Sequence, residues 1–200
     1  ASLNRCLEVA SGEYVARMDG DDRCVPERLA RQVAYLQEHP ELDVVGTAMQ
    51  RFNESGPADV VTLEPRPDRW SLRLGVPFAH ATVLVRKSTY DLLGGYTVAA
   101  RTERGQDLDL WFRFYAHGLA GANLPEALYW VREDSNAIRR RTLKVRYFGV
   151  LTRIRGYRLL GYPKSWYLLP GLEILKAFVP PGVAMAWRRH QARRFARSRC

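Results

Sequence analysis

Hydrophobic residues follow two different spacings that alternate along the chain. Runs containing β-branched and aromatic residues predict strands at 13–18, 42–47 and 82–86. Between the first two runs, Leu29, Val33 and Leu36 recur at i, i+4 and i+7, which predicts a helix from about residue 26 to 39. Strands and helices in alternation favour the α/β class.

The middle of the chain continues this alternation. A short helix is predicted over 88–93, with Gly94 as the residue that ends it. A longer helix begins close to Asp107, because four apolar residues that follow share one face: Leu108, Trp111, Phe112 and Tyr115. The segment 53–67, rich in Gly, Pro and Glu, is predicted to be an irregular loop.

Composition divides the chain into two parts. Of its 200 residues, 46% are hydrophobic, which is enough for one globular core, and the net charge of +10 comes largely from basic residues after Arg139. We therefore expect a domain over 1–138 and a basic, partly amphipathic helical tail over 139–200. Cys6, Cys24 and Cys200 have no metal-type spacing and are odd in number, so a disulfide framework is not expected and a reducing cytoplasm is the natural compartment.

The tail combines basic and apolar residues. Leu143, Tyr147 and Ile154 are among apolar residues at helical spacing, interleaved with Arg and Lys. The stretch 165–187 is mostly apolar, but its prolines and charged residues argue against a simple membrane-spanning helix. We expect it to lie on an anionic membrane surface; solvated helical packing and nucleic-acid binding are the alternatives, and no nucleic-acid-binding motif accompanies it.

The tetrapeptide Asp19-Gly20-Asp21-Asp22 is the strongest chemical signal. It follows a predicted strand, at the strand end where open α/β sheets place their ligands. Close carboxylates repel one another, and hard oxygen ligands suit Mg²⁺ or Mn²⁺ together with substrate phosphates. The same residues also favour a turn and a helix cap that bind nothing.

The surroundings of this tetrapeptide resemble a known family. Residues 1–22 contain Asn4, a short helical segment, Gly12-Glu13-Tyr14-Val15 and then the acidic tetrapeptide, which is similar to the middle of family-2 glycosyltransferases with the GT-A fold. Two later blocks resemble that family in order and distance: Pro77 to Arg86 followed by Gly94-Gly95-Tyr96, and Gly105 to Arg113.

The resemblance implies a fold, a reaction and a set of roles. The fold would be a GT-A-like, Rossmann-like mixed sheet flanked by helices, and the reaction an inverting sugar transfer from a nucleotide-sugar donor to a saccharide or lipid-linked acceptor. Asp107 would be the general base, and Asp19 and Asp21 would bind Mg²⁺ or Mn²⁺. The substrate-binding residues would be Asn4, Asp22, His80, Gln106 and Trp111. On the residues alone, Asp107 also fits a helix cap, His80 a structural histidine and Trp111 core packing.

Three features qualify the resemblance. Gln106 stands where many members have Glu, and Glu133-Asp134 follow the expected strand 128–132 where many have a His. The chain also opens in a segment that normally follows earlier βα units, so we expect an N-terminally truncated piece of a larger enzyme.

A cytoplasmic location at the inner face of the plasma membrane would bring its site close to a lipid-linked acceptor.

Two other function classes remain open. A nucleotidyltransferase would also use carboxylate-bound metal to handle a nucleotide. A non-catalytic membrane or nucleic-acid binding module would explain the basic tail but would give the acidic residues no task.

Overall fold

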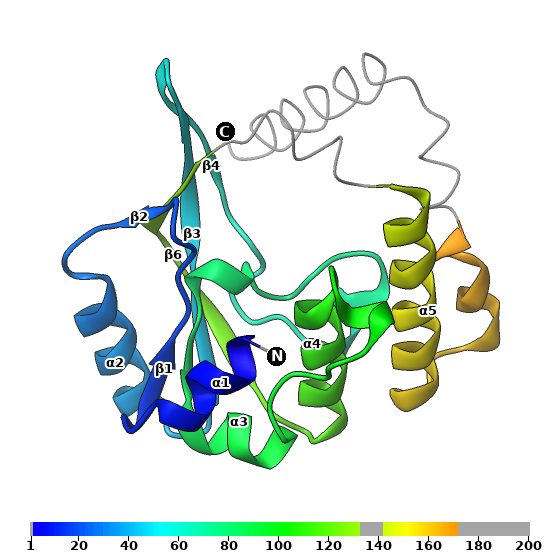
Figure 1. The fold of residues 1–200 in the computed structure, drawn as a ribbon. Coiled ribbons are helices and arrows are strands. Elements are labelled where there is room, and N and C mark those ends of the chain that lie inside the picture. The colour runs from blue at the N-terminus through cyan, green and yellow to red at the C-terminus, as the bar shows by residue number, and fades with distance from the viewer. Residues whose placement is uncertain (1, 133–141, 172–200) are drawn as a thin grey trace.

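The computed structural model describes residues 2–132 and 142–171 (Figure 1). Within these residues a mixed six-stranded sheet has the strand order β1-β5-β3-β6-β2, and β4 pairs with β3 outside that path. The strands are β1 (Tyr14–Ala16), β2 (Arg23–Cys24), β3 (Val44–Asn53), β4 (Gly56–Val61), β5 (Leu84–Arg86) and β6 (Gly121–Arg132). β3 and β6 run parallel, and the other pairs are antiparallel.

Helices cover both faces of this sheet. The α-helices are α1 (Ser2–Val9), α2 (Arg28–Glu38), α3 (Lys87–Leu93), α4 (Gln106–Ala116) and α5 (Leu143–Leu159). The short 3₁₀ helices are η1 (Arg69–Arg73), η2 (His80–Thr82), η3 (Ala100–Thr102) and η4 (Lys164–Leu168). In Figure 1, α2 lies on one side of the sheet and α4 on the other, with α5 beyond α4. The α/β class, with a mixed sheet flanked by helices, is confirmed.

Strands β3 and β5 contain consecutive apolar residues because both faces of the sheet are covered. Val44 faces the core on the α4 side, whereas its neighbour Val45 faces the smaller core beneath α2. In β5 and the residue before it, Val83 and Val85 belong to the first core and Leu84 to the second. Because side chains alternate between faces and both faces are covered, every position can be hydrophobic.

The predicted apolar face of α2 is only partly correct, because Leu36 is buried and Val33 packs against the smaller core but Leu29 is not buried. Leu29 is 46% exposed, and the fully buried side chains of the helix are Arg28, Gln32 and Leu36. Gln32 donates hydrogen bonds to the backbone oxygens of Val45 and Thr82, at 2.8 and 2.9 Å. Polar side chains can face the core here because they satisfy backbone groups that would otherwise be buried without partners.

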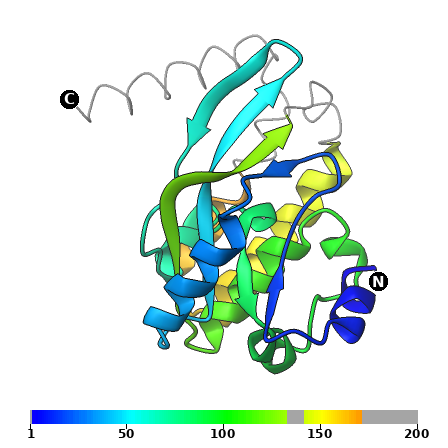
Figure 2. The same ribbon diagram turned by 90° about the vertical axis from the view of Figure 1, so that its left-hand side faces the viewer.

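The loop predicted over 53–67 is only partly correct. Residues 56–61 form β4, which pairs with β3 in a hairpin that projects beyond the helices, as Figure 2 shows. The turn takes a positive φ at Gly56, so the glycine that suggested a loop is the residue that allows a tight hairpin. The short helix α3 and its end at Gly94, with φ of 65°, agree with prediction.

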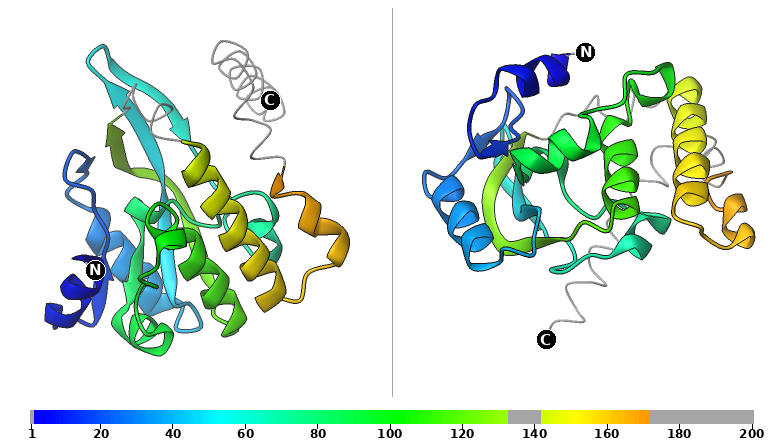
Figure 3. Two further views of the ribbon diagram at one scale, coloured as in Figure 1. Left: turned by 45° about the vertical axis from the view of Figure 1, so that its right-hand side comes forward. Right: turned by 90° about the horizontal axis from the view of Figure 1, so that it is seen from below.

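Helix α5 belongs to the main core, although we expected a separate tail after residue 138. Tyr157 and Tyr162 are buried in the core that α4 supplies, and α5 runs beside α4 in both views of Figure 3. A Cβ on Gly156 would lie 2.2 Å from the Phe112 ring, so this glycine allows the two helices to approach closely.

The predicted apolar stripe of α5 does not match the buried face. Leu143 and Tyr147 are exposed, whereas Thr152, Gly156 and Tyr157 face the core. Among the described helices, none combines the length and the apolar character needed to cross a bilayer. Residues 133–141 and 172–200, on which much of the tail prediction rests, lie outside the described residues.

Candidate functional site

The acidic tetrapeptide forms a turn that is fixed to β6. The backbone N–H of Asp22 donates to the oxygen of Asp19 at 3.2 Å, which closes the turn. The hydroxyl of Tyr129 accepts from the N–H of Asp19 at 3.0 Å and donates to Oδ2 of Asp22 at 2.9 Å. The backbone N–H of Arg132 donates to Oδ1 of Asp22 at 2.8 Å. Asp22 is therefore used to hold the turn in place.

Asp19 and Asp21 are the other two carboxylates of the turn, and they are the candidates for binding a cation. Oδ1 of Asp19 lies 2.7 Å from Nη2 of Arg17, and the Asp19 side chain is 46% exposed. Asp21 is exposed, and in the described part of the chain its carboxylate has no protein partner. Residues 2–132 and 142–171 contain no group of three His, Cys, Asp or Glu side chains that could hold a metal ion. Two carboxylates fit Mg²⁺ or Mn²⁺ when substrate phosphates complete the coordination shell.

Buried Arg28 contacts two residues that flank or anchor the acidic turn, Arg17 and Tyr129. Its Nη2 donates to the backbone oxygen of Arg17 at 2.8 Å, and its guanidinium lies 4.8 Å from the ring centre of Tyr129. Burial lowers the pKa of Arg28, and the nearby side chains of Cys24 and Tyr129 act in the opposite direction. Arg28 thus connects the end of β1, which carries the acidic turn, to β6.

His80 contacts two aromatic rings and is affected by the charges of both acidic segments. It begins η2, and its ring contacts Tyr96 and Trp111 edge-on, each with ring centres 5.6 Å apart. Burial lowers the pKa of His80 to about 4; the charges of Asp107 and Asp19 oppose that shift, and that of Arg17 adds to it. Charges from the acidic turn and from α4 therefore act on the same imidazole.

Asp107 lies in the first turn of α4, as expected, but it does not cap the helix. Gly105 is the N-cap residue and no side chain makes a capping hydrogen bond. Within the described residues, the Asp107 carboxylate has no hydrogen bond or ion pair. The helix N-terminus stabilises its negative charge. Gln106 precedes it half-buried, also without a described side-chain partner.

Asp109, two residues later, is bound on all sides. Thr97 donates to its Oδ2 at 2.6 Å, Arg101 lies 2.5 Å from Oδ1, and Nε of Arg113 donates to Oδ2 at 3.0 Å. Burial alone would raise the pKa of Asp109, but these hydrogen bonds outweigh it and hold the pKa below its usual range. Asp109 therefore fixes the loop before α4 rather than facing the site.

The remaining predicted substrate-binding residues have structural contacts. Trp111 is buried among Phe78, Phe114 and His80, and its Nε1 has no described partner. Asn4 uses both ends of its amide on the backbone of Tyr96: it donates to the oxygen at 2.9 Å and accepts from the N–H at 2.8 Å. The substrate-binding roles of both residues stay predictions.

Sequence reasoning missed four residues that shape the site: Arg17, Arg28, Tyr96 and Tyr129. A signal existed for Arg28, which lies four and eight residues before the buried Gln32 and Leu36 on one helix face. Tyr129 gave no local signal, because its partners in the acidic turn are 107 and 110 residues away in sequence.

Comparisons with known proteins identify sequence relatives of this chain. A family model described as glycosyl transferase family 2 matches residues 1–93. The putative glycosyltransferase EpsE of Bacillus subtilis is 43% identical over 183 residues, covering 92% of this chain and 66% of EpsE. The amylovoran biosynthesis glycosyltransferase AmsE of Erwinia amylovora is 35% identical over 142 residues, covering 70% of this chain and 52% of AmsE.

A solved structure confirms the GT-A-like part of the fold prediction. The crystal structure of residues 1–349 of TarS from S. aureus, in complex with UDP-GlcNAc, is 17% identical with a TM-score of 0.56, covering 78% of this chain and 49% of that one. The chain thus spans between about half and two thirds of the length of the proteins it resembles. From its sequence relatives and its fold, the chain belongs to glycosyl transferase family 2.

Proposed function

We propose that the protein transfers a sugar from a nucleotide-diphosphate sugar to an acceptor hydroxyl, with inversion at the anomeric carbon. The observation that carries this proposal is a contrast in the first turn of α4: Asp109 is bound by hydrogen bonds and ion pairs, whereas the Asp107 carboxylate has no partner among the described residues. The charges of Asp107 and of Asp19, in the acidic turn, both act on His80. A general base has to be free to accept a proton at the place where the substrate reacts. Asp107 meets that requirement and Asp109 does not.

The residues divide the reaction between them. The acceptor oxygen attacks the anomeric carbon while Asp107 takes the hydroxyl proton. The bond from that carbon to the diphosphate breaks on the opposite side, and its electron pair leaves with the nucleoside diphosphate. When bound by Asp19 and Asp21, Mg²⁺ or Mn²⁺ would supply positive charge that offsets the charge of the diphosphate. Asp22 holds the turn in place through its hydrogen bonds to Tyr129 and Arg132.

The names of the similar proteins support the substrate classes. TarS was crystallised with UDP-GlcNAc, which supports a nucleotide-sugar donor for this chain. AmsE is named for the biosynthesis of amylovoran, which supports a saccharide acceptor. A relative from Escherichia coli, 25% identical over 145 residues, is named as a galactosyltransferase that acts on α-D-GlcNAc-diphosphoundecaprenol, which supports a lipid-linked acceptor. Nothing in the described residues identifies the sugar.

Replacement of Asp107 tests the base directly. Asp107→Asn in the full chain should leave donor binding unchanged and lower kcat about 10²- to 10⁴-fold, because an amide cannot accept the proton. Glu103→Gln removes an exposed carboxylate four residues earlier in the chain and is the matched control. Both variants are assayed with a panel of nucleotide sugars. An Asp107→Asn enzyme that keeps most of its kcat would refute the assignment.

Replacement of Asp21 tests the diphosphate site. Asp21→Asn should weaken Mn²⁺-dependent binding of nucleoside diphosphate, whereas the exposed hairpin variant Glu54→Gln should not. Full activity in excess chelator would exclude the metal. Release of inorganic pyrophosphate instead of nucleoside diphosphate would identify a nucleotidyltransferase.

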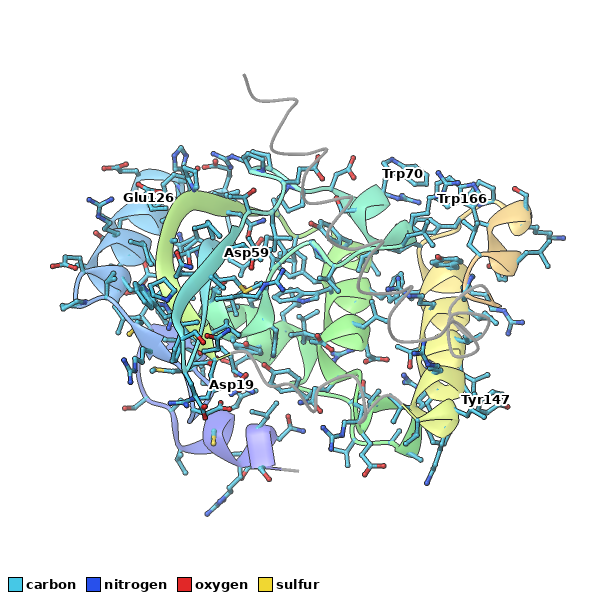
Figure 4. The ribbon with its side chains drawn as sticks, turned by 90° about the horizontal axis from the view of Figure 1, so that it is seen from above. Asp19, Asp59, Trp70, Glu126, Tyr147 and Trp166 are labelled. Atoms are coloured by element: carbon cyan, nitrogen blue, oxygen red, sulfur yellow. The ribbon has the colours of Figure 1, made fainter. Side chains whose placement is uncertain are left out.

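We also propose that the protein binds the cytoplasmic face of an anionic membrane peripherally. Support comes from an aromatic cluster in which the Trp70 ring stacks on Tyr162 and meets the edge of Trp166. Figure 4 shows Trp70 and Trp166 side by side. Trp70 is 46% exposed and the neighbouring Leu168 is 81% exposed. The guanidinium of Arg73 lies 4.3 Å from the ring centre of Trp166. Aromatic and basic side chains together suit a lipid headgroup region.

Flotation of the full chain on vesicles tests this second proposal. Binding to vesicles with phosphatidylserine should fall steeply as salt rises, because a Debye length shortens from about 10 Å at 0.1 M to 3 Å at 1 M. Leu168→Glu should weaken binding, whereas Val9→Glu, equally polar and on the distant α1, should not. Absence of flotation at low salt would refute the proposal.

A further inference from the structure

The hydroxyls of Tyr90 and Tyr96 and the imidazole of His80 form a row of hydrogen-bonded polar groups. The hydroxyl of Tyr90, in α3, lies 3.1 Å from the hydroxyl of Tyr96. The Tyr96 hydroxyl lies 3.0 Å from Nε2 of His80. Nδ1, the other ring nitrogen of His80, is buried and has no hydrogen-bond partner among the described residues.

Counting hydrogens along this row selects one arrangement. If Nε2 of His80 carried the hydrogen, Tyr96 would donate to Tyr90, and the buried Tyr90 hydroxyl would have a hydrogen without an acceptor. If instead Tyr90 donates to Tyr96 and Tyr96 donates to Nε2, both hydroxyls are satisfied. The hydrogen of the imidazole then lies on Nδ1. The second arrangement leaves one buried group without a partner, the Nδ1–H, whereas the first leaves two, the Tyr90 hydroxyl hydrogen and the Nδ1 lone pair. Buried polar groups are hydrogen-bonded wherever possible, so the second arrangement is favoured.

The position of Tyr96 is itself fixed by residues far away in sequence. The amide of Asn4 binds the Tyr96 backbone on both its N–H and its oxygen. The preceding Gly95 has φ of +69°, and a Cβ there would lie 2.9 Å from Oδ1 of Asn4. Asn4 and the glycine pair before Tyr96 thus share one task, which is to hold the Tyr96 hydroxyl against His80.

We propose that Tyr96 is a positioning residue that fixes the tautomer of His80, so that the Nδ1–H donates to a hydroxyl oxygen of the transferred sugar. This rests on the proposed function, because it is the sugar that would lie between the diphosphate at Asp19 and the base Asp107. The charged groups that act on His80 are Asp107, Asp19 and Arg17. A neutral imidazole suits an uncharged hydroxyl better than a diphosphate oxygen, which charge-assisted donors bind more strongly.

The ¹⁵N chemical shifts of His80 in the full chain test the tautomer without any substrate. The expected spectrum shows a protonated Nδ1 and an unprotonated Nε2 at neutral pH. Tyr96→Phe should change the tautomer ratio, whereas Tyr90→Phe, a matched loss of one buried hydroxyl, should leave it unchanged because Tyr96 still donates. A protonated Nε2 in the unmodified protein would overturn the proposal.

Variants of His80 test the contact with the sugar. His80→Asn can keep an N–H near the position of Nδ1, whereas His80→Gln places its N–H near that of Nε2. We expect His80→Gln to weaken binding of a nucleotide sugar roughly three- to tenfold, the value of one neutral hydrogen bond, and His80→Asn to retain most of it. Binding of the matching nucleoside diphosphate alone should not change in either variant. Equal losses in both variants, or equal losses for diphosphate and sugar nucleotide, would overturn the inference.

A titration of the unmodified protein separates failure of this inference from failure of the proposed function. The Nδ1 shift should move on addition of a bound nucleotide sugar and stay in place with the nucleoside diphosphate. Binding of both ligands without a change at Nδ1 would overturn the sugar contact alone. If no nucleotide sugar or nucleoside diphosphate in a broad panel bound, the proposed function and the sugar contact would both fall.

Discussion

Asp22 in the acidic turn and Asp109 in α4 are both bound within the protein, but by different kinds of donor. Asp22 receives its hydrogen bonds from the neutral Tyr129 hydroxyl and a backbone N–H. Asp109 receives ion pairs from the guanidinium groups of Arg101 and Arg113. Neutral donors fix a carboxylate without cancelling its charge, whereas two arginines cancel it.

This difference matches what each segment is proposed to do. Apart from the ion pair of Asp19 with Arg17, the acidic turn keeps its negative charge, which favours a divalent cation that in turn binds a diphosphate. At the start of α4, the charge of Asp109 is compensated, so the neighbouring Asp107 stands as a single carboxylate suited to accepting one proton. The comparison predicts where each substitution should act, on folding or on ligand binding.

The largest expected effect is on folding, at Asp109. Asp109→Asn should lower the free energy of unfolding by about 3–5 kcal/mol, because two partly buried arginines lose the counter-charge of a buried carboxylate. Asp107→Asn should change it by less than about 0.5 kcal/mol, as for an ordinary unpaired site. Urea denaturation followed by tryptophan fluorescence measures both. Equal effects would remove the distinction between the two carboxylates.

The next effect is a pH dependence that arises at His80, between the two segments. Its folded pKa, lowered by burial to about 4, is below the ordinary value of 6.5, so the folded protein binds fewer protons than the unfolded chain between these pH values. Stability is therefore fully present above about pH 6.5 and falls by about 1.4 kcal/mol per pH unit down to about pH 4. His80→Asn should remove that slope in denaturation curves measured from pH 7 to 4. An unchanged slope would show that other groups cause it.

The smallest effect concerns the anchor of the acidic turn. Tyr129→Phe should cost about 1–3 kcal/mol of stability, because Oδ2 of Asp22 and the N–H of Asp19 both lose a partner. Binding of Mn²⁺ with nucleoside diphosphate should weaken as well. Tyr35→Phe, whose hydroxyl makes no hydrogen bond within the described residues, is the control. Unchanged nucleotide binding in Tyr129→Phe would show that the turn keeps its conformation without the hydrogen bonds of the Tyr129 hydroxyl.

The sequence was most informative where local pattern and tertiary position agree. The strand at Val44 and Val45, the helix that begins near Asp107 and the αL glycine after α3 follow from periodicity and glycine chemistry. Periodicity misjudged α2, because Arg28 and Gln32 are buried to satisfy backbone groups of other elements. No local pattern identifies partners such as Tyr129 and Tyr96, since their roles depend on how the strands and loops meet in three dimensions.

The long separation between Tyr129 and the acidic turn has a consequence for synthesis of the protein. The turn emerges from the ribosome 110 residues before the hydroxyl that anchors Asp19. At about 5–20 residues per second, roughly 5–20 s pass between the two events. During the first part of that interval β1 also lacks β5, its neighbour in the sheet. A nascent chain therefore carries its acidic residues unanchored, and the proposed cation site is completed only when β6 has been made.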